Sequence, residues 1–188
     1  MKLSKTFVKR SLLILTLILA GALSLQSCSN LTVNAYSDIK PELDIEEFFT
    51  GSLTAHGVVK NRAGKVIRHF NATIEGTWND EGGVLHEEFL FSDGEEQTRI
   101  WKLRKLDDEN YIGTAADVIG EGKLKLAGNA LFLNYVLRVP YNDGTIDVRV
   151  DDRMYKVDDN TIINESILTK FGFKVGSVVL TIVKSNQA

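Results

Sequence analysis

The stretch HFNATIEGTW, residues 69–78, alternates apolar and polar side chains over ten positions. Phe70, Ile74 and Trp78 share one side of this alternation, and Thr73 and Glu75 share the other. A period of two is typical of a β-strand with one buried face and one face in solvent. The stretch therefore predicts a long strand whose apolar face packs on a core.

Turn signals divide the chain on both sides of this strand into similar segments. Asp-Gly at residues 93–94 and Asn-Asp-Gly at residues 142–144 are flanked by apolar alternation, a pattern that favours tight hairpins. No convincing amphipathic helix interrupts the series. The expected strands are residues 52–60, 65–78, 84–91, 96–106, 111–118, 123–127, 130–139, 145–157, 161–169 and 174–184.

About ten sequential strands joined by short turns predict an all-β fold. Such a meander avoids exposed edges either by closing into a barrel or by folding as a sandwich. The long segments between Lys65 and Leu106 suit tilted barrel strands better than sandwich strands. We therefore expect an antiparallel up-and-down meander that closes into a lipocalin-like barrel.

The N-terminus resembles an export signal. Four basic residues precede SLLILTLILAGALSL, residues 11–25, which carries no charge. About 15 apolar residues are too few for a transmembrane helix, which needs about 20, but suit a secretory signal. We expect a cleaved signal peptide at residues 1–27, a lipidated flexible tether at 28–45 with order beginning near Glu46, and a β-barrel domain at 46–188.

Leu25-Gln26-Ser27-Cys28 resembles a bacterial lipobox, and Cys28 is the only cysteine of the chain. The resemblance implies that Cys28 becomes the lipidated N-terminus, carrying acyl chains such as palmitate. Each buried CH2 group contributes roughly 0.8 kcal/mol to membrane anchoring. Because Ser29 rather than Asp follows the cysteine, the resemblance favours the outer membrane, facing the periplasm. A signal peptide with a stray cysteine, or a retained membrane helix, is the alternative.

Charge and length exclude some classes of function. The formal net charge is −3 at pH 7, and removal of residues 1–27 with their four basic residues takes it to −7. An acidic domain does not lie on an anionic membrane by its net charge, and it lacks the basic character of a nucleic-acid binder. The remaining 161 residues suffice for one domain with a sizeable core.

Several short motifs are similar to a family of bacterial lipoproteins of unknown function, number 3833 among the domains of unknown function. The resemblance spans about residues 46–184 and implies an anchored lipoprotein, but it brings no activity with it. The matching pieces are Phe48-Phe49-x-Gly51, Glu88 with a phenylalanine close behind it and then Asp93-Gly94, Arg99-x-Trp101, Tyr111-x-Gly113, Ala116-Asp117-Val118, Gly128-Asn129-Ala130, Tyr135, Asp151-Asp152-x-Met154 and Lys170-Phe171-Gly172.

Charged residues inside strand-like segments mark a candidate site. Asp152 falls on an otherwise apolar face, and a buried carboxylate needs a partner because an unpaired buried charge is costly. Arg99, on the same face as Trp101, is the natural partner for an aspartate. A structural ion pair, a ligand contact and acid–base catalysis are the three possible roles. The candidate polar cluster consists of Arg99, Trp101, Asp117, Asp152, Tyr135 and Asn129.

No metal, cofactor or nucleophile is indicated by the remaining motifs. His56, His69 and His86 lie in three consecutive strands and could in principle hold zinc. His69, however, lies on the polar face of its strand, so we expect the histidines to be solvated. The chain also lacks a G-x-S-x-G motif and a phosphate-binding glycine loop.

The predicted function is binding rather than catalysis. The apolar inner face of the barrel either encloses a cavity or is filled completely by side chains. We expect a membrane-anchored protein that binds a lipid-like or small apolar ligand. The alternatives are a structural or interaction lipoprotein with a filled core, and an acid–base enzyme that uses Asp117, Asp152 and Arg99.

Overall fold

The computed structural model describes residues 31–185 of the chain. The predicted signal peptide, Cys28 and Ser29 lie outside the described residues. Within the described range, none of the helices has the length and apolar character needed to cross a membrane.

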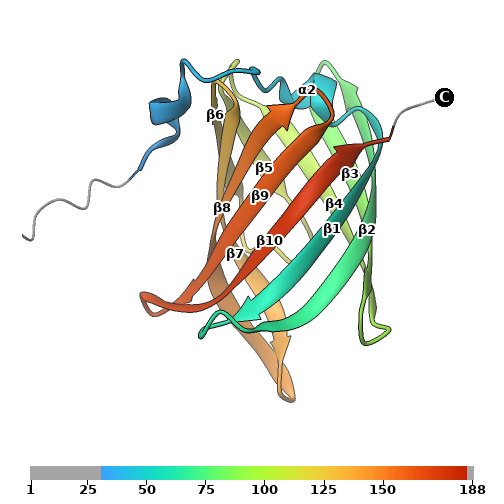
Figure 1. Ribbon diagram of the computed structural model, residues 1–188, viewed down its shortest axis with the longest axis vertical. Coiled ribbons are helices and arrows are strands. Elements are labelled where there is room, and N and C mark those ends of the chain that lie inside the picture. The colour runs from blue at the N-terminus through green and yellow to red at the C-terminus, as the bar shows by residue number, and fades with distance from the viewer. Residues whose placement is uncertain (1–30, 186–188) are drawn as a thin grey trace, which may run out of the picture. The chain divides into compact units, whose positions relative to one another are not determined.

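Ten antiparallel strands form a closed barrel (Figure 1). Each strand pairs with its neighbours in sequence, and β1 pairs with β10 to close the wall. The predicted all-β, up-and-down barrel is therefore confirmed. The strands are β1 Gly51–Asn61, β2 Val66–Asn79, β3 Gly82–Phe91, β4 Glu96–Lys105, β5 Asn110–Thr114, β6 Gly122–Ala127, β7 Ala130–Tyr141, β8 Gly144–Asp158, β9 Thr161–Lys170 and β10 Phe173–Lys184.

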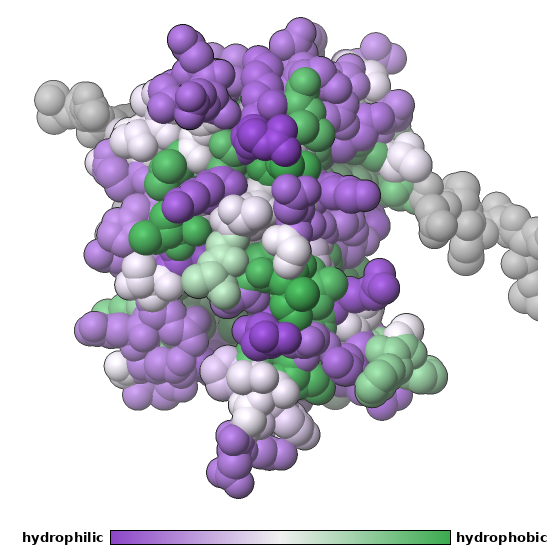
Figure 2. Space-filling view, turned by 180° about the vertical axis from the view of Figure 1, so that it is seen from behind, coloured by the Kyte–Doolittle hydropathy of each residue, from purple (hydrophilic) through white to green (hydrophobic). Residues whose placement is uncertain are grey.

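The alternation in residues 69–78 orients β2 as predicted. Phe70, Ala72 and Ile74 are each 5% exposed, while the residues between them face solvent. β2 pairs with β3 without a bulge from Phe70↔Phe91 to Asn79↔Gly82. A slip of one residue would turn every apolar side chain outward, so the pattern fixes the register. The face of the barrel seen in Figure 2 is mostly hydrophilic, with hydrophobic side chains gathered in patches.

Residues 33–45 are ordered, in contrast to the predicted tether. The short 3-10 helix η1, Val33–Tyr36, lies beside β6 and β7, where Val33 packs against Ala130 and Phe132. Leu43 is also buried. The order extends to this segment because its few apolar side chains find partners that are distant in sequence.

The helix α2, Ile45–Phe48, covers one end of the barrel (Figure 1). The Asp44 side chain caps it by accepting a hydrogen bond from the Glu47 amide at 2.9 Å. Phe48 and Phe49 are buried, and the Trp78 indole donates to the Phe49 carbonyl at 3.3 Å. The opposite end carries the β1–β2, β3–β4, β7–β8 and β9–β10 hairpins.

The barrel wall between β4 and β7 is completed by an irregular segment. β5 and β6 have only five and six residues, so they line only the part of this wall nearer α2. Residues 115–121 fill the rest, through a bridge between Val118 and Leu137 and a hydrogen bond from the Arg138 amide to the Asp117 carbonyl at 2.8 Å. This segment places Asp117 beside the interior of the barrel.

Candidate functional site

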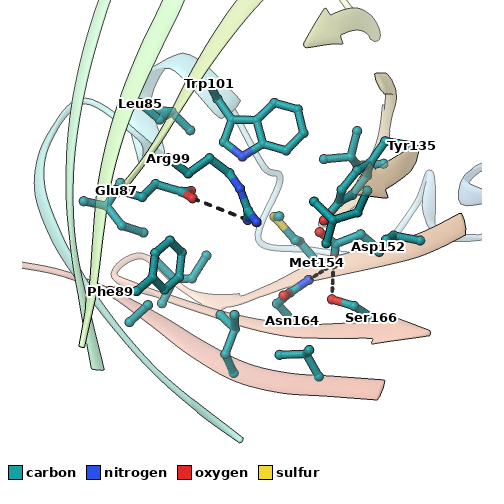
Figure 3. A pocket seen from close by; sticks show the side chains of 18 of the residues that line it. Leu85, Glu87, Phe89, Arg99, Trp101, Tyr135, Asp152, Met154, Asn164 and Ser166 are labelled. Atoms are coloured by element: carbon teal, nitrogen blue, oxygen red, sulfur yellow. Dashed lines mark hydrogen bonds and ion pairs between the residues drawn. The ribbon is translucent and has the colours of Figure 1, made fainter. Parts of the chain in front are cut away.

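The inner faces of the strands enclose a cavity of about 200 Å³ (Figure 3). This volume far exceeds the roughly 10–15 Å³ that one water molecule needs. Most of the wall is apolar or aromatic, with Phe49 beneath α2 and Phe89, Leu133 and Leu180 along the strands. The polar side chains that line it are Glu87, Gln97, Arg99, Tyr135, Asp152, Asn164 and Ser166.

Arg99 of β4 pairs with Asp117, one of the aspartates for which the sequence made it a candidate partner. Its Nε lies 3.0 Å from Oδ2 and 3.2 Å from Oδ1 of Asp117, and its Nη2 lies 2.7 Å from Oδ2. Two-pronged contacts of this kind are the strongest arginine–carboxylate geometry. The Asp117 side chain is 38% exposed and the Arg99 side chain 20%. The pair thus joins β4 to the segment 115–121 with the guanidinium on the cavity side.

Glu87 of β3 has a largely buried side chain, 14% exposed, that the sequence reasoning missed. It faces Arg99 in the strand register, and its Oε2 lies 3.9 Å from Arg99 Nη1. Burial raises the pKa of Glu87 to about 7, although the nearby Arg99 acts in the opposite direction. The alternation of β3 could have indicated this residue, because Glu87 falls between Leu85 and Phe89 on the inward face of the strand.

Asp152 of β8 lies inside the barrel and is 6% exposed. Its Oδ1 accepts hydrogen bonds from the Ser166 hydroxyl at 2.8 Å and from the Asn164 amide. Both partners come from β9, where the register places Ser166 opposite Asp152. Burial raises the pKa of Asp152, while these two hydrogen bonds oppose the rise. Asp152 is therefore supported by β9 and not by a direct ion pair with Arg99.

Trp101 and Tyr135 form an aromatic pair beside these charges. Their ring centroids are 5.3 Å apart and the rings are nearly perpendicular, which is a favourable edge-to-face geometry. Burial, followed by the negative charge of Asp152, raises the pKa of Tyr135 above its ordinary value. Tyr135 is therefore a neutral phenol that can donate or accept a hydrogen bond in the cavity.

Asn129 lies apart from the other predicted site residues. It sits in the β6–β7 turn, where its side-chain amide donates to the Lys156 carbonyl at 2.9 Å and its own carbonyl accepts from the Lys156 amide at 2.8 Å. It does not line the cavity. The structure thus brings Arg99, Trp101, Asp117, Tyr135 and Asp152 together, and gives Asn129 a role in the turn.

The three histidines are exposed on the outer surface of the barrel, as predicted. His56 Nδ1 lies 2.7 Å from the Asn71 side-chain oxygen. Across residues 31–185 no group of His, Cys, Asp and Glu side chains is arranged to hold a metal ion.

Carboxyl groups outnumber guanidinium groups around the cavity. Glu87 and Asp152 line it, Asp117 borders it, and Arg99 is the one guanidinium on the cavity wall within residues 31–185. Arg99 engages Asp117 most closely, lies 3.9 Å from Glu87, and makes no direct ion pair with Asp152. The arrangement favours a guest with hydrogen-bond donors or a positive charge over a guest with its own carboxylate.

The fold and the site define the class of this protein as an up-and-down β-barrel with a polar cluster inside an apolar cavity. Residues 22–184 match the model of a family described as a protein of unknown function, DUF3833, so the chain belongs to that family. No curated protein matches the sequence.

Two solved structures share the fold. An S-type phycobiliprotein lyase, CPES, from Guillardia theta is 15% identical with a TM-score of 0.56, over 78% of this chain and 95% of that chain. A protein of unknown function from the DUF3598 family of Nostoc punctiforme is 13% identical with a TM-score of 0.54, over 78% of this chain and 51% of that one. The predicted lipocalin-like architecture is thereby confirmed at the level of the fold.

Proposed function

We propose that this protein binds a small lipid-like molecule inside its barrel, with an apolar body and a head group that donates hydrogen bonds or carries positive charge. The observation that carries the proposal is the cavity of about 200 Å³, lined by apolar side chains and by the carboxylates of Glu87 and Asp152. Apolar walls with a few convergent polar groups are typical of small-molecule sites.

The head-group preference follows from the partners already present. Asp152 has two neutral donors, and Glu87 has one guanidinium at 3.9 Å that Asp117 engages more closely. A guest ammonium or hydroxyl group would supply further donors to these two carboxyl groups. A filled-core structural protein is the weaker alternative because it would need no such space.

Native mass spectrometry tests the proposal. The described residues from Val33 onward form one compact unit, so a chain from Ser29 contains the complete barrel. We expect this chain, purified gently from its own host, to carry additional mass. Leu168→Trp places an indole in the cavity and should abolish that mass, whereas Ile167→Trp on the exposed outer face of the same strand should retain it. Equal occupancy in both variants, or an empty wild-type chain, would contradict the proposal.

We also propose that Cys28 carries lipid and anchors the barrel at the outer membrane, facing the periplasm. The basic start, the uncharged run at residues 11–25 and the lone cysteine before Ser29 support this. Metabolic labelling with a palmitate analogue should mark the wild-type chain in the membrane fraction. Cys28→Ser should lose the label and accumulate as unprocessed precursor, and a processed, membrane-bound Cys28→Ser chain would refute the anchor.

Acid–base catalysis is the second candidate function. It is favoured by one observation, the raised pKa of two carboxyl groups that face the same cavity, Glu87 and Asp152. Burial alone accounts for both shifts, so binding remains the leading proposal. If the co-purified molecule is converted by wild-type chain but not by Asp152→Asn, catalysis replaces simple binding.

A further inference from the structure

Two neighbouring hairpins at the end opposite α2 expose apolar side chains. The β1–β2 and β9–β10 hairpins lie side by side because β1 pairs with β10 as far as Asn61↔Gly176 (Figure 1). We call residues 60–67 and 170–175 the hairpin surface. Figure 2 shows hydrophobic surface projecting at the lower right, where the β9–β10 hairpin extends beyond the barrel. The exposed apolar residues, with exposed fractions, are Phe171 88%, Phe173 69%, Ile67 56%, Val66 46% and Val175 40%.

The same surface is basic in an acidic protein. It holds Lys60, Arg62, Lys65, Lys170 and Lys174 and no acidic residue, although the whole chain has a net charge of −3.

Three acidic groups of the adjacent hairpins, Asp93, Glu95 and Asp147, are paired with arginines. Asp93 and Glu95 bind Arg68 at 2.7 and 2.9 Å, and Asp147 binds Arg138 at 2.9 Å. The hairpin surface is therefore locally positive although the net charge of the chain is negative.

Folding does not account for the phenylalanine at position 171. Phe171 has a φ of 52°, a left-handed conformation that is unfavourable for a bulky side chain. The β7–β8 turn has the same conformation at Asn142, a residue type that tolerates it well. The Phe171 side chain is 88% exposed, so packing does not compensate for this unfavourable backbone conformation.

We infer that the hairpin surface docks on an anionic phospholipid membrane. Aromatic side chains favour the interfacial region of a bilayer, and lysine and arginine are attracted to anionic head groups. Phe171 and Phe173 would enter the interface while Lys60, Arg62, Lys65 and Lys174 contact lipid phosphates. Lys170 instead donates to the Asp147 carbonyl at 2.6 Å. The docking would bring the bilayer close to the cavity, because Val59 and Val178 line the cavity from the hairpin ends of β1 and β10. The inference stands apart from the proposed ligand and from Cys28.

Vesicle sedimentation tests the inference with the chain from Ser29. We expect binding to vesicles of phosphatidylcholine with phosphatidylglycerol, little binding to phosphatidylcholine alone, and release as salt is added. Phe171→Asn with Phe173→Ser should weaken binding about tenfold or more while leaving the thermal midpoint unchanged or higher, because Asn suits the backbone there.

A charge-matched pair separates the surface from net charge. Lys65→Glu with Lys174→Glu should weaken binding about tenfold or more. Lys102→Glu with Arg104→Glu, on the exposed outer face of β4, changes the net charge equally and should bind like wild type. Equal loss of binding in both pairs would overturn the inference, as would no binding of wild type at low salt. Self-association that Phe171→Asn abolishes would also overturn it, because the hairpin surface would then bind a second copy of the chain.

Discussion

At the scale of single residues, Glu87 couples the stability of the barrel to pH. Burial raises its pKa from an ordinary 4.5 to about 7. Between these values the folded chain keeps a proton that the unfolded chain has released. The contribution to the free energy of unfolding is therefore complete below about pH 4.5 and is lost as the pH rises through about 7, by at most about 3 kcal/mol.

Urea unfolding of wild type and Glu87→Gln across this pH range measures the coupling. The free energy of unfolding of wild type should fall between about pH 5 and pH 8, and the Gln variant should show a smaller fall. Some fall remains because burial also raises the pKa of Asp152. Glu88→Gln, at the exposed next position, should behave like wild type. A Glu87→Gln curve that parallels wild type would contradict the raised pKa.

Arg99 should contribute far more to the stability of the fold than an arginine in an exposed ion pair. Arg99→Met leaves Glu87 and Asp117 without their cation, and breaking a largely buried pair costs about 3–5 kcal/mol. Arg138→Met removes the pair with Asp147, in which the arginine side chain is 53% exposed, and should lower stability far less because solvent screens that pair. Chemical denaturation of the two variants measures the difference. Equal losses would mean that Arg99 is solvated and does not belong to a buried cluster.

At the scale of elements, the cap formed by α2 depends on a glycine in β2. A methyl group on Gly76 would lie 1.6 Å from the Phe49 carbonyl oxygen, which the backbone after α2 cannot avoid without moving. Gly76→Ala should therefore destabilise the fold by about 3 kcal/mol or more. Gly144→Ala meets no atom within 4 Å and should change stability by less than about 0.5 kcal/mol. Thermal unfolding compares the two variants. Similar midpoints would show that the backbone after α2 does not pack closely on β2 at Gly76.

Local patterns in the sequence were sufficient to predict the strands, while the site depended on pairing. Turn signals such as residues 142–144 located the hairpins, and alternation oriented Arg99, Trp101 and Asp152 inward. Cross-strand neighbours were not predictable, because turn signals locate a hairpin only to within a residue or two and a slip of one residue changes every partner. Ser166 opposite Asp152, and Glu87 opposite Arg99, were missed for this reason.

Irregular segments were the least predictable elements. The expected strand 111–118 ends at Thr114, and residues 115–121 then cross the wall as a loop that delivers Asp117 to Arg99. The order of residues 33–45 was also missed, because its apolar residues follow no period and their partners lie about a hundred residues away in β7.

At the scale of the whole molecule, the closed barrel separates three regions. α2 covers one end, the opposite end carries the hairpin surface, and the cavity lies inside with its carboxylates held by β3, β8 and β9. Closure of the wall by β1 and β10 removes the sheet edges that would otherwise invite aggregation. A rigid wall of this kind can hold the carboxyl groups of Glu87 and Asp152 in place for a guest.

Calorimetric titration with decylamine and decanoate, both below their micelle concentrations, tests the central claim most directly. The two probes share a chain length and differ only in head group. We predict that the wild-type barrel binds decylamine at least about tenfold more tightly than decanoate at pH 8, where Glu87 is mostly ionised, and that Asp152→Asn with Glu87→Gln removes this preference. Equal affinity for the two probes, tighter binding of decanoate, or no binding of either would contradict the account.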